Sequence, residues 1–133
     1  MVLHLCTVLV VEDDPLIRLA LTDSLEDEGY IVLEAANVME AIAVLGRQGK
    51  IDVLVTDIDM PGWLNGLDLA RLVRGYDSEV TIIVTSGGHI VADEDLPIGG
   101  RFLIKPYRMQ DVVAVLKDAI RATAPDVDFR QAV

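Results

Sequence analysis

Short apolar runs alternate with stretches of helical period along most of this 133-residue chain. The runs are continuous in Val, Ile and Leu and do not alternate with polar residues, which is typical of strands that are covered on both faces. They predict five strands, over Thr7–Val11, Ile31–Leu33, Val53–Thr56, Val80–Val84 and Phe102–Ile104.

Helix-capping signals lie between these runs. Asp14 followed by Pro15 provides an N-cap and a proline at the first helical position, and Asn37 with Glu40 resembles a capping box. The predicted helices run from Pro15 to Gly29, from Asn37 to Gly49, over Leu67–Arg74 with a stop at Gly75, and over Gln110–Ala122. The alternation predicts an α/β fold with a doubly wound, five-stranded parallel sheet.

The segment from Gly87 to Gly100 departs from the pattern. Two glycines, three adjacent acidic residues and Pro97 leave room for barely two helical turns, so we expect a shortened or irregular fourth helix. Its apolar residues should pack on the sheet or on a partner; they are Ile90, Val91, Leu96 and Ile98. We expect this segment to pass a signal to a partner, the alternative being a rigid loop without a signalling role.

Composition and charge narrow the class of protein. The length suits one domain, and the formal net charge of −11 disfavours nucleic acid and anionic membranes while favouring cations or a basic face on a protein partner. There is no signal-peptide layout and no apolar run long enough to span a bilayer. Because the single cysteine, Cys6, cannot form an internal disulfide, we expect a cytoplasmic protein. Residues 123–133 are expected to be a short polar tail.

Polar side chains follow four of the five predicted strands. Ligands of doubly wound sheets bind beyond the carboxyl ends of the strands, so these side chains are expected to meet at one edge of the sheet. They are Glu12 and Asp13 after the first strand, Asp57 and Asp59 after the third, Thr85 and Ser86 after the fourth, and Lys105 after the fifth. Asp14 is expected to serve only as a helix cap.

These residue types fit phosphoryl transfer. Clustered carboxylates repel one another unless a cation lies among them, and ligation by oxygen alone is the habit of Mg²⁺. An ionised Asp beside such a metal can act as a nucleophile and form an aspartyl phosphate. Lys105 and Thr85 would stabilise the charge on the transferred group. The fifth strand lies about 10 Å from the third, so only a long cationic side chain can reach.

Four segments resemble the receiver domain of two-component response regulators: VLVVEDDP, VLVTDIDMPGWLNG, IIVTSG and FLIKPY. The resemblance spans about residues 5 to 122. It implies a flavodoxin-like strand order of 2-1-3-4-5 and a cis peptide between Lys105 and Pro106. It also implies a bound Mg²⁺ ion and a phosphoryl donor that is a histidine kinase or a histidine phosphotransfer protein.

The same resemblance implies a role for each site residue. Asp57 would be the phosphoacceptor, and Thr85 and Lys105 would contact the phosphoryl group. The metal site would comprise Asp13 directly, Glu12 through water, Asp57, and the backbone carbonyl of Asp59. Thr85 and Phe102 would form the switch, with Phe102 as the aromatic residue that changes rotamer on activation. Glu12 stands where the family more often has Asp.

We therefore expect a stand-alone, chemotaxis-type response regulator, with a receiver domain over residues 1–122 and a tail over 123–133. It would be a signalling protein and not an enzyme beyond its own phosphotransfer and autodephosphorylation, and its output would be a downstream protein target.

Other classes are weighed against this one. DIDMPG also resembles the Asp-x-Asp signature of haloacid-dehalogenase-like Mg²⁺-dependent phosphatases. Those enzymes open with that motif and carry their acidic pair last, whereas Glu12 and Asp13 come first here. A docking module that has lost the chemistry would lack a strand-end residue, and none is missing. A further alternative is the receiver fragment of a hybrid histidine kinase.

Overall fold

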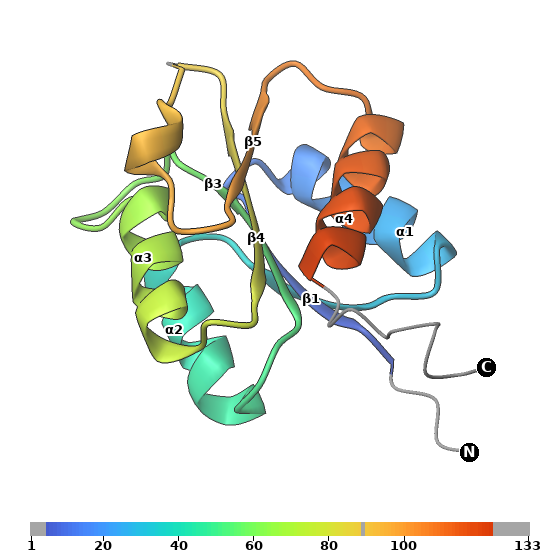
Figure 1. Ribbon diagram of the computed structural model, residues 1–133, viewed down its shortest axis with the longest axis horizontal. Helices are drawn as coiled ribbons and strands as arrows, with labels where there is room; N and C mark the ends of the chain where they lie inside the picture. Colours follow the sequence, from blue (N-terminus) through green and yellow to red (C-terminus); the bar gives the residue numbers. More distant parts are fainter. Residues whose placement is uncertain (1–4, 89, 124–133) are drawn as a thin grey trace.

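The computed structural model describes residues 5–88 and 90–123, which form a five-stranded parallel sheet between two layers of helices (Figure 1). The strand order β2-β1-β3-β4-β5 confirms the predicted fold class and topology. The strands are β1 (Thr7–Val11), β2 (Ile31–Ala35), β3 (Val53–Asp57), β4 (Thr81–Ser86) and β5 (Arg101–Ile104). The apolar runs thus located every strand, with ends that shift by at most two residues.

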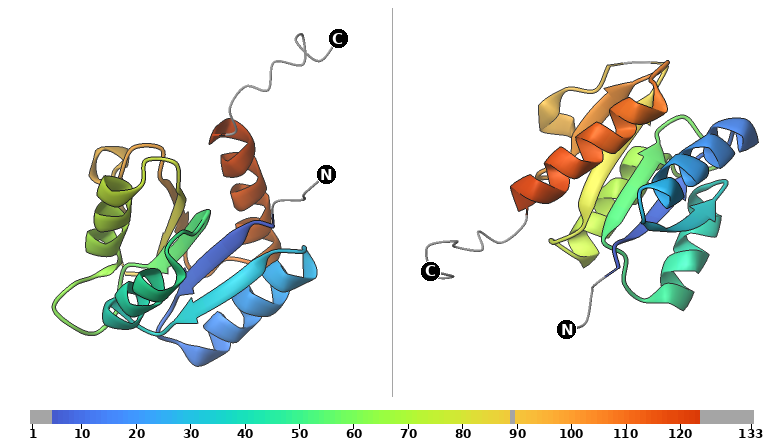
Figure 2. Two further views of the ribbon diagram at one scale, coloured as in Figure 1. Left: turned by 90° about the horizontal axis from the view of Figure 1, so that it is seen from below. Right: turned by 90° about the vertical axis from the view of Figure 1, so that its right-hand side faces the viewer.

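Two helices cover each face of the sheet (Figure 2). The helices are α1 (Pro15–Asp27), α2 (Val38–Gln48), α3 (Gly66–Tyr76) and α4 (Met109–Thr123). Helices α2 and α3 pack on one face through buried residues such as Ala41 and Leu69, and α1 and α4 pack on the other through Leu25 and Leu116. The tail predicted for residues 123–133 lies outside the described residues, apart from Thr123 at the end of α4.

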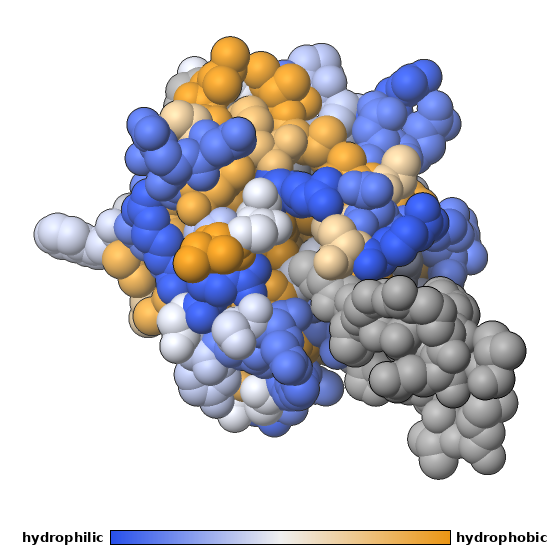
Figure 3. All heavy atoms as spheres, in the orientation of Figure 1, coloured by the Kyte–Doolittle hydropathy of each residue, from blue (hydrophilic) through white to orange (hydrophobic). Residues whose placement is uncertain are grey.

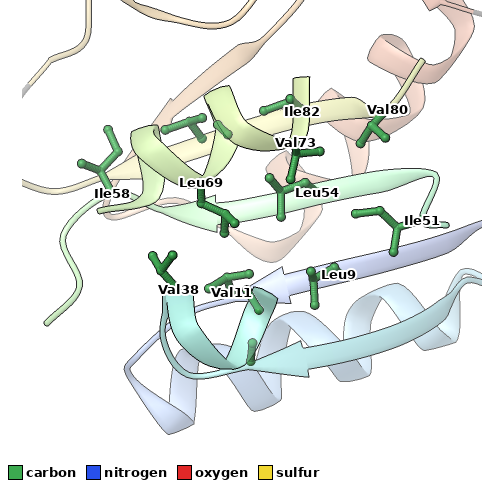
Figure 4. Packing of buried hydrophobic residues seen from close by; sticks show 14 of the residues in the cluster. Leu9, Val11, Val38, Ile51, Leu54, Ile58, Leu69, Val73, Val80 and Ile82 are labelled. Atoms are coloured by element: carbon green, nitrogen blue, oxygen red, sulfur yellow. The ribbon is translucent and has the colours of Figure 1, made fainter. Parts of the chain in front are cut away.

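Side chains along each strand point to the two faces in turn. Leu9 and Leu54 belong to the core on the α2/α3 face (Figure 4), whereas Val10 and Val55 belong to the core on the α1/α4 face. All five residues of β1 and of β3 are buried, because helices cover both faces. This burial explains why the strands read as continuous apolar runs.

Helix α1 confirms the predicted capping. The carboxylate of Asp14 accepts hydrogen bonds from the backbone N–H groups of Leu16 (2.9 Å) and Ile17 (3.3 Å), and Pro15 occupies the first helical position. The role of Asp14 as a helix cap, separate from its two acidic neighbours, is therefore confirmed.

The predicted stop of the third helix at Gly75 is wrong. Helix α3 continues through Gly75 to Tyr76, with a helical backbone at the glycine. The guanidinium of Arg74 donates to the carbonyl of Ser78 (2.8 Å), which satisfies a backbone acceptor beyond the helix end. At its N-terminal end, α3 has a complete capping box between Asn65 and Asp68, which was not predicted.

The segment from Gly87 to Gly100 confirms the prediction of an irregular fourth helix. Within its described residues it contains only one turn of 3₁₀ helix, η1 (Asp93–Asp95). Val91 and Leu96 pack against the core of the α2/α3 face as expected. Ile90 and Ile98 do not pack there: they are 78% and 88% exposed. In Figure 3, apolar surface gathers at the upper end of the molecule, near η1 and β5.

Within the described part of the chain, no helix has both the length and the apolar character needed to cross a bilayer.

The first residue of α3 passes close to the end of β3. A Cβ atom on Gly66 would overlap the backbone carbonyl of Asp57 and would lie 2.9 Å from the Cα of Ile58, whereas a Cβ on Gly75 in the same helix would meet nothing within 4 Å. The N–H of Gly66 also donates to the carbonyl of Ile58 (3.1 Å). This approach fixes the end of β3, which carries Asp57, and the loop that follows it.

We predict that Gly66→Ala lowers the free energy of unfolding by about 1–3 kcal/mol, because backbone must move to admit the methyl group. The matched variant Gly75→Ala should be neutral or up to about 1 kcal/mol more stable, since alanine favours a helix over glycine. Urea unfolding of both variants measures the difference. Equal stability of the two would contradict the close approach at Gly66.

Candidate functional site

The carboxyl ends of β1, β3, β4 and β5 bring the predicted site residues together. Glu12, Asp57 and Thr85 are almost fully buried, with exposed fractions of 1%, 4% and 2%. Asp57 and Thr85 are paired in the register of β3 and β4. By the alternation along each strand, these residues and Lys105 continue the row of side chains on the α1/α4 face. Asp13 is exposed beside them.

Lys105 bridges two buried carboxylates. Its Nζ lies 2.7 Å from Oε1 of Glu12 and 3.2 Å from Oδ2 of Asp57, so the side chain reaches from β5 across β4 to the ends of β3 and β1. Lys105 thus spans the distance for which the sequence predicted a long cationic side chain. The bond to Glu12 was not predicted.

Burial dominates the electrostatics of the site. It raises the pKa of Asp57 and that of Glu12 above their ordinary values, and the hydrogen bonds and charge of Lys105 offset this only in part. Burial alone would lower the pKa of Lys105, but its bonds and attraction to the two carboxylates raise that pKa instead. One ammonium thus faces two buried carboxylates, with the carboxylate of Asp13 beside them, and negative charge is left in excess.

This excess charge suits a hard cation. Glu12, Asp13 and Asp57 each offer an oxygen, and these three atoms lie within 4.8 Å of one another. A set of oxygen ligands with one exposed member is the arrangement in which Mg²⁺ keeps several waters. The residues present therefore fit the predicted ion.

Glu12 is held on both oxygens by the protein. Oε1 accepts from Lys105, and Oε2 accepts from the backbone N–H of Asp14 at 3.2 Å. The guanidinium of Arg18 donates to the backbone carbonyl of Glu12 (2.8 Å) and fixes the turn. Both oxygens of this carboxylate are therefore engaged, as are those of Asp57, whose Oδ1 accepts from the N–H of Asp59 (3.4 Å) and whose Oδ2 faces Lys105.

The side chain of Asp59 joins the loop after β3 to the end of β4. Its Oδ2 accepts a hydrogen bond from the buried hydroxyl of Ser86 (2.8 Å), and the same hydroxyl accepts from the N–H of Gly88 (3.2 Å). Ser86 directly follows Thr85 and opens the irregular segment. A displacement of β4 at Thr85 would therefore move this segment and the loop after β3, which carries Asp59.

Phe102 is paired with Val84 in the register of β4 and β5, and it packs against the core of the α2/α3 face. By alternation, Thr85 belongs to the other face, and Ser86 is the residue beside it that shares the face of Phe102. The two predicted switch residues are neighbours through the backbone of β4. The peptide between Lys105 and Pro106 is cis, as the resemblance implied.

Three contributors to the site were not assigned from the sequence. Gly66 follows Asn65 at the start of a helical pattern, which is a signal for the beginning of a helix. That this glycine lies against the backbone of Asp57 can be recognised only from the tertiary structure. Ser86 was noted as a strand-end residue, but its bond to Asp59 depends on tertiary structure. Tyr107 has a buried hydroxyl beside the site, and nothing in the sequence distinguishes it from a packing residue.

Comparison with known proteins agrees with this geometry. A family model described as the response regulator receiver domain matches residues 8–117. The response regulator MprA of Mycobacterium leprae is 32% identical over 122 residues, which are 90% of this chain and 53% of that protein. The sensor kinase CckA of Brucella abortus is 30% identical over 118 residues, covering 86% of this chain and 12% of the kinase. The chain thus spans about half the length of MprA.

Solved structures show the same architecture. A response regulator receiver protein from Sinorhizobium medicae has a TM-score of 0.79 at 25% identity, over 92% of this chain and 99% of that one. The response regulator TrrA from Thermotoga maritima, solved in complex with Mg²⁺ and BeF, has a TM-score of 0.74 at 28% identity, over 86% and 99% of the two chains.

Proposed function

The chain belongs to the response regulator receiver family, whose members are phosphoacceptor signalling switches, and we propose that Asp57 is the residue that accepts the phosphoryl group. One observation carries this proposal. Asp57 is a buried carboxylate that Lys105 contacts (3.2 Å), that belongs to the acidic cluster with Glu12 and Asp13, and that is paired with Thr85 in the register of β3 and β4.

The proposed reaction is a transfer from a phosphohistidine donor. A carboxylate oxygen of Asp57 attacks phosphorus, the phosphorus–nitrogen bond of the donor breaks, and the imidazole takes a proton from solvent. The ammonium of Lys105 and the hydroxyl of Thr85 lie at the neighbouring strand ends, where they can neutralise charge on the phosphoryl oxygens. Hydrolysis of the acyl phosphate by water would return the domain to its resting state.

We propose Mg²⁺ as the cofactor. Asp13 and Asp57 would hold the ion directly, Glu12 through water, and the backbone carbonyl of Asp59 would complete the protein ligands. When bound, the ion would neutralise the carboxylates and the incoming phosphoryl group. The relative TrrA, which was solved with Mg²⁺ and BeF, supports this choice of metal.

The proposed switch starts with the negative charge that phosphorylation adds at Asp57. Thr85 would move towards the phosphoryl group, and Phe102 would change rotamer in response. The bonds from Ser86 to Asp59 and Gly88 give this movement a route into residues 87–100. A segment with one 3₁₀ turn and two exposed isoleucines is easily reordered by a partner.

The proposed partners are proteins. A histidine kinase or a histidine phosphotransfer protein would supply the phosphoryl group, and a downstream protein would read the switch. The receiver would span residues 1–122 and work in the cytoplasm. The match to CckA supports a second assignment, the receiver of a hybrid histidine kinase, which keeps the same site chemistry. The comparisons do not favour the haloacid-dehalogenase-like phosphatase.

Asp57 is predicted to be the sole site of acyl phosphate. With acetyl phosphate and Mg²⁺, intact mass spectrometry should show one phosphoryl addition, and Asp57→Asn should abolish it because the amide is not a nucleophile. Asp14→Asn is the matched control: it removes the same charge, keeps a good helix cap and should be labelled like the wild type. Labelling of Asp57→Asn at the wild-type level would refute the assignment.

Mg²⁺ is predicted to stabilise the native state by mass action, by about 2.7 kcal/mol at 100 times Kd. Asp13→Asn should lose most of this gain without becoming less stable in the absence of metal, because one of the repelling carboxylates is gone. Thermal unfolding over a Mg²⁺ titration measures both effects, with Asp14→Asn again as the control. If wild type and Asp13→Asn respond to Mg²⁺ alike, Asp13 is not a ligand.

A further inference from the structure

The hydroxyl of Tyr107 is a buried polar group without an acceptor in the resting site. Tyr107 lies two residues after Lys105, and its ring packs against the core of the α1/α4 face. The hydroxyl oxygen is shielded from solvent and has no hydrogen-bond partner within the described residues. Leaving such a group unpaired costs free energy, and a phenylalanine would fill the same space without that cost.

The polar groups that act on this hydroxyl belong to the candidate functional site. The charged groups that act on it are Glu12, Lys105 and Asp57. Thr85 is the side chain close enough to act on it through a hydrogen bond, but their geometry falls short of a hydrogen bond in the resting site. Burial, and then the charge of Glu12, raises the pKa of Tyr107 to about 12. The hydroxyl therefore keeps its proton at any ordinary pH and can act as a donor.

Thr85 can accept the proton of Tyr107 while it donates its own proton to a phosphoryl oxygen. A threonine hydroxyl donates one hydrogen bond and accepts through its lone pairs. When Thr85 donates to a phosphoryl oxygen, its own oxygen becomes a more polarised acceptor, because hydrogen bonds in a chain strengthen one another. Both carboxylates that lie near Tyr107 already accept bonds from Lys105.

We propose that Tyr107 is a positioning residue of the switch, which donates a hydrogen bond to Oγ of Thr85 when Thr85 binds the phosphoryl group on Asp57. The inference rests on the proposed function. Tyr107 acts through Thr85 and does not touch the phosphoryl group. Its unpaired hydroxyl destabilises the resting state and is satisfied in the phosphorylated state, so it shifts the equilibrium towards the latter.

The variant Tyr107→Phe tests this by removing one oxygen atom. Tyr30→Phe is the matched control, since Tyr30 packs against the same core and the groups that act on it are Cys6, Lys117 and Glu28, away from the site. The probe is beryllofluoride, a phosphoryl analogue, with Mg²⁺ present. Tyr107→Phe should bind it about fivefold more weakly, which corresponds to the loss of one neutral hydrogen bond, and should be at least as stable without it. Tyr30→Phe should bind like the wild type.

A double-mutant cycle with Thr85→Ala separates positioning from packing. In that background, Tyr107→Phe should cause no further loss of beryllofluoride affinity, whereas a packing effect would persist. The inference is overturned, while the proposed function stands, if wild type and Tyr107→Phe bind beryllofluoride equally well. The same holds if Tyr107→Phe loses as much beryllofluoride affinity in the Thr85→Ala background as in the wild type. If the wild type neither binds beryllofluoride nor takes a phosphoryl group from acetyl phosphate, the proposed function fails and the inference fails with it.

Discussion

One lysine ammonium balances two carboxylates that the sheet has removed from water. Glu12 and Asp57 are almost fully buried, and Lys105 contacts both. Two buried carboxylates thus share one positive charge, and the exposed carboxylate of Asp13 lies beside them at the edge of the cluster. This excess of negative charge is what the proposed Mg²⁺ would neutralise.

The sheet makes this arrangement possible. The strand order places β1 next to β3 and β5 two strands away from β3, so that the acids are neighbours and the cation reaches them from a distance. Helix α3 begins so close to β3 that only glycine fits at position 66. On the other side of Asp57, the bond from Ser86 to Asp59 ties the site to the segment that replaces a regular fourth helix. The strand ends thus position the site residues. The irregular segment that follows β4 lies where the proposed switch would contact a partner.

The sequence predicted the strands and the meeting of the strand-end residues, because these follow from local patterns and from the parallel sheet that they imply. The strand order was implied by the resemblance to receiver domains. The sequence did not predict that α3 passes through Gly75, because a glycine costs a helix only about 1 kcal/mol and the bond from Arg74 to the carbonyl of Ser78 supports this end. Nor did it predict the bond between Lys105 and Glu12, which joins residues 93 positions apart. Ile90 and Ile98 do not pack on the sheet, so of the two roles expected for them only packing on a partner remains.

The shared lysine is tested most directly by following the side-chain carboxyl carbons of Glu12 and Asp57 by NMR over a pH titration without metal. The account predicts that both groups titrate above the ordinary values, about 4.3 for Glu and 3.9 for Asp, and that they titrate as a coupled pair. The variant Lys105→Met removes the cation and should raise the pKa values of both carboxyl groups further, because the partner that favours their charged forms is gone. Independent titration of both carboxyls at or below their ordinary values, unchanged in Lys105→Met, would contradict it.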